Sequence, residues 1–166
     1  NICYNTSSQV FHQHYGRENI VRNNIFAFGR EGQAAITRKE EHLSFTFERN
    51  LFIADGQPMF VGGGGGKLET KPFHSNLNLF WDVSGREPIS GNGGPDENAC
   101  FSLRRTFSVE QLRELGYDLH SVYADPKFRD LANFDFTLLE DSPAIALGFQ
   151  PIDAANVGPR PKGKRD

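Results

Sequence analysis

Cysteine is nearly absent from this sequence: Cys3 and Cys100 are the only two among its 166 residues. Two cysteines are too few for the disulfide framework of a small secreted domain, and no zinc-type spacing of cysteines occurs. We interpret both as free thiols, with a single bridge between them as the alternative. Without such cross-links a fold depends on a hydrophobic core, and hydrophobic residues make up 37% of the chain.

Long apolar runs and an excess of positive charge are also missing. No stretch approaches the roughly 20 apolar residues that a membrane-spanning helix needs, so we predict no membrane partner. Acidic residues (21) outnumber basic ones (18), and the formal net charge is −3. Nucleic-acid-binding domains normally carry a basic stripe, whereas basic residues here gather most densely in the short tail after Pro159. We therefore predict no nucleic-acid partner.

A short unit repeats along the first half of the chain: Asn, an aliphatic residue, and an aromatic residue soon after. It begins at Asn1, Asn24, Asn50 and Asn78, with spacings of 23, 26 and 28 residues. Periods in the twenties match one turn of a β-solenoid. A leucine-rich horseshoe has a similar period, but its leucine pattern is missing, and we expect no helix before Gly62.

The residues before each repeated Asn have the pattern of strands. In the segment before Asn50, apolar and polar positions alternate, so Leu43, Phe45 and Phe47 share one face. Asn tolerates left-handed backbone angles, which suits a sharp corner between two strands.

Stacked corners of this kind predict two features of the solenoid. The Asn side chains would form a ladder along the axis, and the strands beside them would pair in parallel. The aliphatic residue after each Asn would occupy equivalent inward positions, namely Ile25, Leu51 and Leu79.

The repeat is interrupted in the second half of the chain. Five glycines at 62–66 predict a loop, residues 77–81 a returning strand, and residues 85–98 a second loop. The best helix pattern follows at 108–116, with a Ser N-cap, a Gln three residues later and a terminal Gly. We expect this helix to cover the end of the solenoid, where strand edges would otherwise be open.

The fold class predicted from these patterns is all-β. We expect a right-handed parallel β-helix, with rungs in residues 1–85. Residues 86–166 would add a loop, a short helix and a C-terminal capping segment of the same domain.

Several segments resemble a group of bacterial right-handed parallel β-helix proteins that are pectate-lyase-like in fold. They are residues 11–33 (FHQHYGRENIVRNNIFAFGREGQ), 42–50 (HLSFTFERN), 120–122 (HSV), 124–128 (ADPKF), 135–136 (DF), 142–144 (SPA), 148–153 (GFQPID) and 157–160 (VGPR). Some members of the group are glycoside hydrolases of the α-L-fucosidase and xylanase type. The resemblance implies the C-terminal part of a secreted or periplasmic carbohydrate-active enzyme, with a polysaccharide or oligosaccharide substrate, upstream β-helix rungs as partner, and no cofactor.

The first candidate site follows from alternation along one strand. If Phe11 and Tyr15 face the core, Gln13 joins them, and His12 and His14 point outward about 7 Å apart. Two outward imidazoles beside Tyr15 could bond sugar hydroxyls or transfer protons. Ordinary surface histidines are the alternative. Since no further histidine is placed beside this pair by the sequence, we predict no metal site.

Charged residues after later strands extend this site. Glu31 is a candidate catalytic carboxylate, and Arg30 would hold its pKa down, although a surface ion pair is the alternative. Arg38 belongs to a mixed-charge corner that ends at His42, and it would contact either the groove or only solvent.

The single tryptophan, Trp81, is the last candidate. Phe80 and Trp81 point to opposite sides of a strand, so one of them faces outward and could stack on a sugar ring. Core packing is the alternative.

Together these patterns predict a polysaccharide-binding cleft, with Glu31 and His14 as candidate catalytic residues. The substrate-binding candidates are His12, His14, Tyr15, Arg30, Arg38 and Trp81. Two alternatives stay open, a polysaccharide lyase and a non-catalytic carbohydrate-binding or adhesive solenoid. Glycosidases use two carboxylates roughly 5 to 10 Å apart, and the repeats carry no outward acidic pair. We therefore expect this chain alone to be inactive, with catalytic carboxylates upstream.

Overall fold

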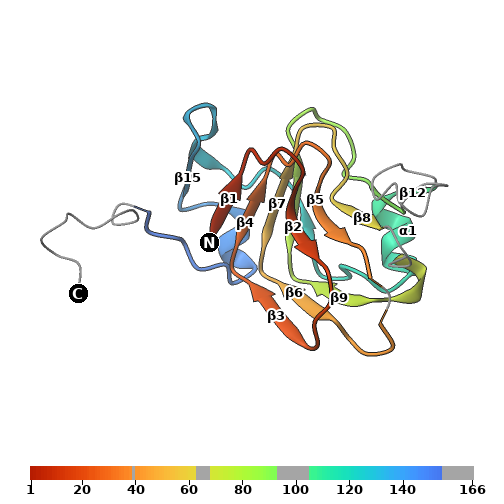
Figure 1. Ribbon diagram of the computed structural model, residues 1–166. Coiled ribbons are helices and arrows are strands. Elements are labelled where there is room, and N and C mark those ends of the chain that lie inside the picture. The colour runs from red at the N-terminus through yellow and green to blue at the C-terminus, as the bar shows by residue number, and fades with distance from the viewer. Residues whose placement is uncertain (39, 63–67, 93–104, 155–166) are drawn as a thin grey trace, which may run out of the picture.

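The computed structural model describes residues 1–38, 40–62, 68–92 and 105–154. They form a parallel β-helix in which three full turns of three short strands stack along one axis (Figure 1). Sheet A consists of β1 (Ile2–Tyr4), β4 (Ile25–Ala27), β7 (Leu51–Ala54), β10 (Leu79–Asp82) and β13 (Val122–Tyr123). The all-β fold class predicted from the sequence is confirmed.

Two further sheets complete the walls of the helix. Sheet B consists of β2 (Gln9–Gln13), β5 (Gly32–Ile36), β8 (Phe60–Gly62), β11 (Ser90–Asn92) and β12 (Arg105–Phe107). Sheet C consists of β3 (Asn19–Arg22), β6 (Phe45–Glu48) and β9 (Phe73–Asn76). All pairs in the three sheets are parallel except β11 with β12.

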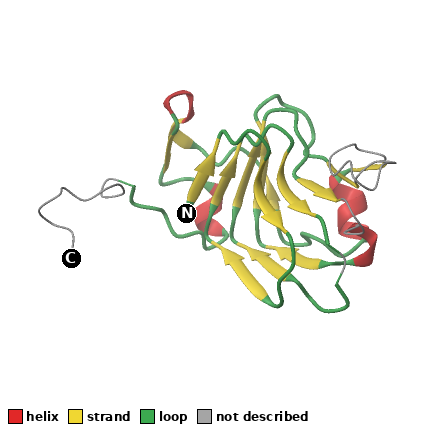
Figure 2. Ribbon diagram, viewed as in Figure 1, coloured by secondary structure: helices red, strands yellow, loops and turns green. Residues whose placement is uncertain are grey.

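The remaining elements are short helices and one hairpin that lie outside the three sheets. They are the 3-10 helix η1 (Leu68–Thr70), α1 (Val109–Glu114), β14 (Phe128–Asp130), the 3-10 helix η2 (Leu131–Asn133), β15 (Asp135–Leu138) and α2 (Pro143–Ala146). Strands dominate the body, and α1 lies at the end of the stack away from the N-terminus (Figure 2). None of the helices in the described ranges is long and apolar enough to cross a membrane.

The interior of the β-helix, here called the bore, is packed with aromatic rings from successive turns. In sheet A the centroid distances are 5.4 Å for Phe26–Phe52, 5.1 Å for Phe52–Phe80 and 5.2 Å for Phe80–Tyr123. In sheet C the ring of Phe45 stacks on Phe73 at 4.9 Å. These columns explain much of the high phenylalanine content, because each turn places a ring directly above the preceding one.

The register of sheet A confirms the predicted stacking. Ile25 pairs with Leu51, and Leu51 with Leu79, in parallel strands. Their predicted inward direction is wrong. The rings of Phe26 and Phe52 fill the bore, and the aliphatic residue that precedes each of them in the strand points outward. Both faces of sheet A are therefore apolar, as in a parallel sheet covered on both sides.

The C-terminal segment covers this outward face of sheet A. Phe136, Ala144 and Phe149 form one buried cluster with Ile25 and Leu51, and Phe149 is only 2% exposed. The segment thus shields the outward apolar face of sheet A from solvent.

An asparagine ladder runs along the corner between sheets C and A. Asn24 Oδ1 accepts from Asn1 Nδ2 (2.9 Å), Asn50 Oδ1 from Asn24 Nδ2 (2.9 Å), and Asn78 Oδ1 from Asn50 Nδ2 (3.2 Å). The backbone N–H groups of Asn24 and Asn50 donate to the same oxygens. Asn50 and Asn78 are fully buried. The ladder predicted from the repeat is confirmed.

The sharp corner itself lies one residue earlier than predicted. Asn23, Arg49 and Leu77 have left-handed φ angles of 56°, 52° and 58°, and each directly precedes a ladder asparagine. The ladder asparagines instead use their side chains to bond the next turn. Arg and Leu at these positions show that the stacked turns impose a backbone conformation that the side chains do not favour.

The two loops predicted at 62–66 and 85–98 lie only partly within the described residues. Gly62 ends β8, and the other glycines of the run lie outside the described residues. Within the loop expected at 85–98, residues 85–89 form neither helix nor strand, residues 90–92 instead form β11, and residues 93–98 lie outside the described ranges. Cys3 is a free thiol, and Cys100 also falls outside those ranges.

The predicted helix is confirmed as α1, with a complete capping box between Ser108 and Gln111. Leu112 belongs to the cluster that fills the bore, and Leu115 packs against that cluster. Helix α1 therefore covers the end of the stack.

Removing the Phe149 ring tests the cover on sheet A. We expect Phe149→Ala to lower the free energy of unfolding by about 3 to 4 kcal/mol, because a buried ring is replaced by a cavity. Phe134→Ala is the matched control on the same segment. Its ring is 40% exposed and stacks on Tyr4, so about 1 kcal/mol is expected. Urea unfolding measures the free energy of unfolding of both variants. Equal decreases would contradict the claim that Phe149 covers the outward face of sheet A.

Candidate functional site

The candidate site lies where β2 and β5 end side by side in sheet B. Gln13, the last residue of β2, pairs with Ile36, the last residue of β5. His14 and Tyr15 follow β2 directly, and Arg38 follows β5 by two residues. One turn of the β-helix thus brings together residues that are 23 to 26 positions apart in the sequence.

The side chains at this edge form a row of planar groups. The ring centroids of His12 and His14 are 5.9 Å apart, and those of His14 and Tyr15 are 5.0 Å apart, both edge to face. The guanidinium carbon of Arg38 lies 5.5 Å from the Tyr15 ring centroid, within cation–π range. These four residues are called the His–Tyr–Arg cluster below.

The exposure of these residues agrees with part of the predicted alternation. His12 and His14 are exposed, and Gln13 is buried, as predicted. Tyr15 was placed in the core on the assumption that the strand continues, but its side chain is 64% exposed. The strand ends at Gln13, and Tyr15 has a φ of 130°, so alternation no longer determines its direction.

A hydrogen-bond chain sets the tautomer of His12. The Thr37 hydroxyl donates its proton to the Gln13 carbonyl (2.7 Å), which can only accept. The hydroxyl must then accept from His12 Nε2, which lies 2.8 Å away. His12 therefore carries a proton on Nε2. In the neutral ring this leaves the Nδ1 lone pair available.

The charge state of His12 follows from its surroundings. Partial burial lowers the pKa of His12, and electrostatic interactions with His14 and Arg38 lower it further. His12 is consequently neutral at pH 7. A neutral imidazole with a free Nδ1 can accept a hydrogen bond or a proton from a bound molecule.

A buried amide holds the loop that carries Arg38. Gln13 Oε1 accepts from the backbone N–H groups of Thr37 (3.3 Å) and Arg38 (3.2 Å), and Gln13 Nε2 donates to Glu40 (3.2 Å). Glu40 also accepts from the Ser44 hydroxyl at 2.9 Å. Gln13 thereby fixes the start of the corner against β2.

The mixed-charge corner is thus not a uniformly solvated turn. The Glu40 side chain is only 13% exposed, and its carboxylate lies 3.4 Å from His42 Nε2. Sequence reasoning missed the roles of Gln13, Thr37 and Glu40. A polar residue at an inward strand position was the available indication, because such a group needs buried partners.

Arg30 and Glu31 lie at the other end of β5. Glu31 directly precedes Gly32, which pairs with Gln9 at the start of β2. Its carboxylate accepts from the Ser8 hydroxyl and from Gln9 Nε2 (2.9 Å). The structure therefore does not bring Glu31 together with His14, since the length of β2 separates them.

Trp81 lies at neither of these places. Phe80 fills the bore and Trp81 faces outward, which confirms the predicted opposition of the two side chains. Trp81 is partly exposed, packs against the C-terminal cluster, and lines an open hollow of about 270 Å³.

Metal-binding side chains do not gather at any of these places. Within the described ranges, no three His, Cys, Asp or Glu side chains come close enough to hold a metal ion. The side chains of the His–Tyr–Arg cluster itself supply imidazole, phenol and guanidinium groups.

Comparison with known proteins adds one similarity. No family model matches the chain, and no solved structure matches it. The chain is 29% identical over 99 residues to the uncharacterized protein YwoF of Bacillus subtilis (strain 168). The match covers 60% of this chain and 19% of YwoF, so the chain matches about a fifth of the length of that relative.

Proposed function

We propose that this chain is the C-terminal part of a longer carbohydrate-active β-helix enzyme, and that the His–Tyr–Arg cluster lines its polysaccharide-binding cleft. The observation that carries the proposal is the exposed row of planar side chains at the edge of sheet B. A polysaccharide or oligosaccharide is the proposed substrate, and a secreted or periplasmic location belongs to the same proposal.

The chemistry of the cluster suits a sugar chain. The apolar face of a pyranose ring packs on an aromatic side chain such as Tyr15, which is 64% exposed. Arg38 donates hydrogen bonds to hydroxyl oxygens, and His12 Nδ1 accepts from a hydroxyl group. Spacings of 5 to 6 Å between the rings are compatible with contacts to one or two sugar units.

Upstream turns are the proposed partner of this chain. β1, β2 and β3 each stand at the edge of their sheet, so the described first turn presents three strand edges to a further rung. Phe11 and Val21 on these strands are only partly buried. A preceding rung would pair with these edges and bury this cross-section.

The catalytic carboxylates of a glycoside hydrolase would come from such upstream turns. Glu31 lies a strand length from His14, and Glu40 is engaged by Gln13 and Ser44. Glycosidases use a pair of carboxylates about 5 to 10 Å apart, and Glu31 and Glu40 do not form such a pair at the cluster. The contribution proposed for this chain is therefore substrate binding, with His14 beside the reacting groups.

A polysaccharide lyase is the second candidate, and one observation favours it. His12 is a neutral base with a free Nδ1, and the Arg38 cation belongs to the same cluster. A base next to a cation can remove the proton beside a uronate carboxylate while the cation stabilises the developing charge. A product with an ultraviolet-absorbing double bond would identify this reaction.

Substitutions in the cluster test the binding role. We expect Tyr15→Ala and His14→Ala to weaken polysaccharide binding about tenfold, because each removes a planar contact worth roughly 1 kcal/mol or more. Affinity gel electrophoresis with arabinoxylan, xyloglucan and polygalacturonate measures the change. Tyr4→Ala and His74→Ala are matched controls, since both side chains are exposed but lie on other strands. Equal effects in cluster and control variants would contradict the proposal.

Turnover by the isolated chain tests where the catalytic carboxylates lie. We expect no release of reducing sugars from the same polysaccharides by residues 1–166 alone, because a complete carboxylate pair is not assembled at the cluster. Hydrolysis by the purified chain that disappears in Glu31→Gln would instead place the whole active site within these residues.

A further inference from the structure

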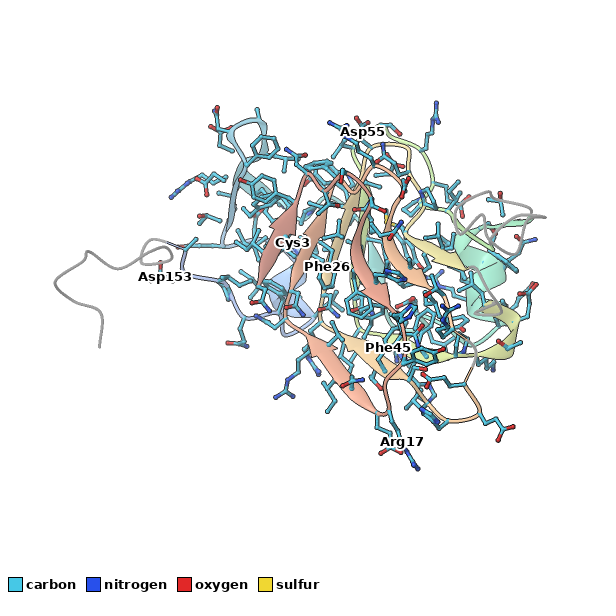
Figure 3. The ribbon with its side chains drawn as sticks, in the orientation of Figure 1. Cys3, Arg17, Phe26, Phe45, Asp55 and Asp153 are labelled. Carbon is cyan, nitrogen blue, oxygen red and sulfur yellow. The ribbon has the colours of Figure 1, made fainter. Side chains whose placement is uncertain are left out.

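An open hollow lies at the corner where the strands of sheet A end, whereas the His–Tyr–Arg cluster lies at the corner where β2 and β5 of sheet B end. Trp81 comes from the outer face of β10, Arg86 and Pro88 from the turn before β11, and Asp125 from the residues after β13. The volume is about 270 Å³. In Figure 3, Asp55, on a neighbouring turn, lies at the top of the view, and Arg17, beside the cluster, projects at the bottom. The two places are thus well separated.

The rim of this hollow offers one donor and one acceptor that no other described residue occupies. The exposed Arg86 guanidinium has no hydrogen-bond or ion-pair partner among the described residues. Asp125 Oδ1 accepts from the backbone N–H of Lys127 at 2.7 Å. Asp125 Oδ2 has no partner within the described ranges. Both groups are therefore available to a ligand.

A buried carboxylate holds the turns around the hollow in place. Asp82 is 4% exposed and accepts from the backbone N–H of Gly56 with both oxygens (3.0 Å). It also accepts from the N–H (2.9 Å) and the hydroxyl (2.7 Å) of Ser84. The two turns beside the hollow are thus tied to β10, and Arg86 lies over the Gly56 backbone. The site is organised before any ligand arrives.

The pairing of charges at the rim indicates the class of ligand. A phosphate or another strong anion would meet the Asp125 carboxylate as well as Arg86, and the repulsion would cancel much of the attraction. A neutral polyol satisfies both groups, since its hydroxyls accept from guanidinium and donate to carboxylate. Trp81 lines the hollow and is partly exposed, so it supplies apolar aromatic surface beside them.

The size of the hollow limits the ligand to one ring. Pockets for drug-sized ligands begin at roughly 300 Å³, and this hollow lies just below that value. We propose that the hollow binds a single neutral pyranose ring, packed on Trp81 and hydrogen-bonded to Arg86 and Asp125. This site shares no residue with the His–Tyr–Arg cluster and stands on its own geometry.

Fluorescence of Trp81 tests the proposal directly, because it is the only tryptophan in the chain. The whole chain, at submicromolar concentration, is titrated with xylohexaose, cellohexaose, mannohexaose and galactohexaose, and with oligogalacturonate as the anionic counterpart. We expect a saturable change in tryptophan emission with at least one neutral hexaose. Arg86→Gln and Asp125→Asn should each weaken that binding about tenfold, and both positions are exposed, so the variants should fold.

Two control variants separate this site from other effects. Arg129→Gln removes an exposed arginine that pairs with Asp135 elsewhere, and it should leave the titration unchanged. His14→Ala should also leave it unchanged, which distinguishes this site from the cluster. A flat response to every neutral hexaose would overturn the proposal. A response that survives in both Arg86→Gln and Asp125→Asn, or one given by oligogalacturonate alone, would do the same.

Discussion

The side-chain hydrogen bonds of the asparagine ladder are the interaction on which this β-helix depends. Each carboxamide accepts from the turn before and donates to the turn after, so the amide dipoles of Asn24, Asn50 and Asn78 align. The last amide donates to Asp118 Oδ1 (3.2 Å), which also accepts from Ser75 and Ser121. Burial raises the pKa of Asp118 in spite of these donors. The ladder thus ends on a fully buried carboxyl group that caps the row of amides.

A ladder of this kind determines the register of all three sheets. An amide reaches its neighbour only when successive turns are directly stacked, so the rings of Phe26, Phe52 and Phe80 fall into one column. Because the interior is apolar, an unpaired amide there would be costly, and the wrong register is disfavoured. The same stacking aligns the ends of β2 and β5, where the His–Tyr–Arg cluster forms.

Sequence analysis predicted two kinds of feature correctly: those marked by a residue type that repeats, and those set by alternation along a single strand. The repeated Asn predicted the ladder and the parallel sheets, and alternation predicted the exposure of His12 and His14. The inward direction assigned to Ile25 was wrong because both faces of its strand are apolar, so the pattern carries no information on which face meets the bore. The cover comes from Phe149, more than 100 residues later.

The candidate site was predicted only in part, for a related reason. His12, His14 and Tyr15 are neighbours in sequence, and Arg38 joins them because one turn separates the two strands. Glu31 was grouped with them, yet it lies at the opposite end of β5. The support from Thr37 and Glu40 depends on which partners a buried Gln13 finds, and local periodicity does not identify these partners.

The most direct test of this account is the stability of ladder variants. Asn50→Ala removes the acceptor of Asn24 and the donor to Asn78, and Asn50→Asp keeps only acceptors. Each should lower the free energy of unfolding by about 3 kcal/mol or more, since an unsatisfied buried group costs roughly 1 to 3 kcal/mol. Asn19 is exposed, and changing it to Ala or Asp should lower the free energy of unfolding by less than about 1 kcal/mol. Ladder variants as stable in urea as the Asn19 variants would contradict the claim that these hydrogen bonds hold the turns together.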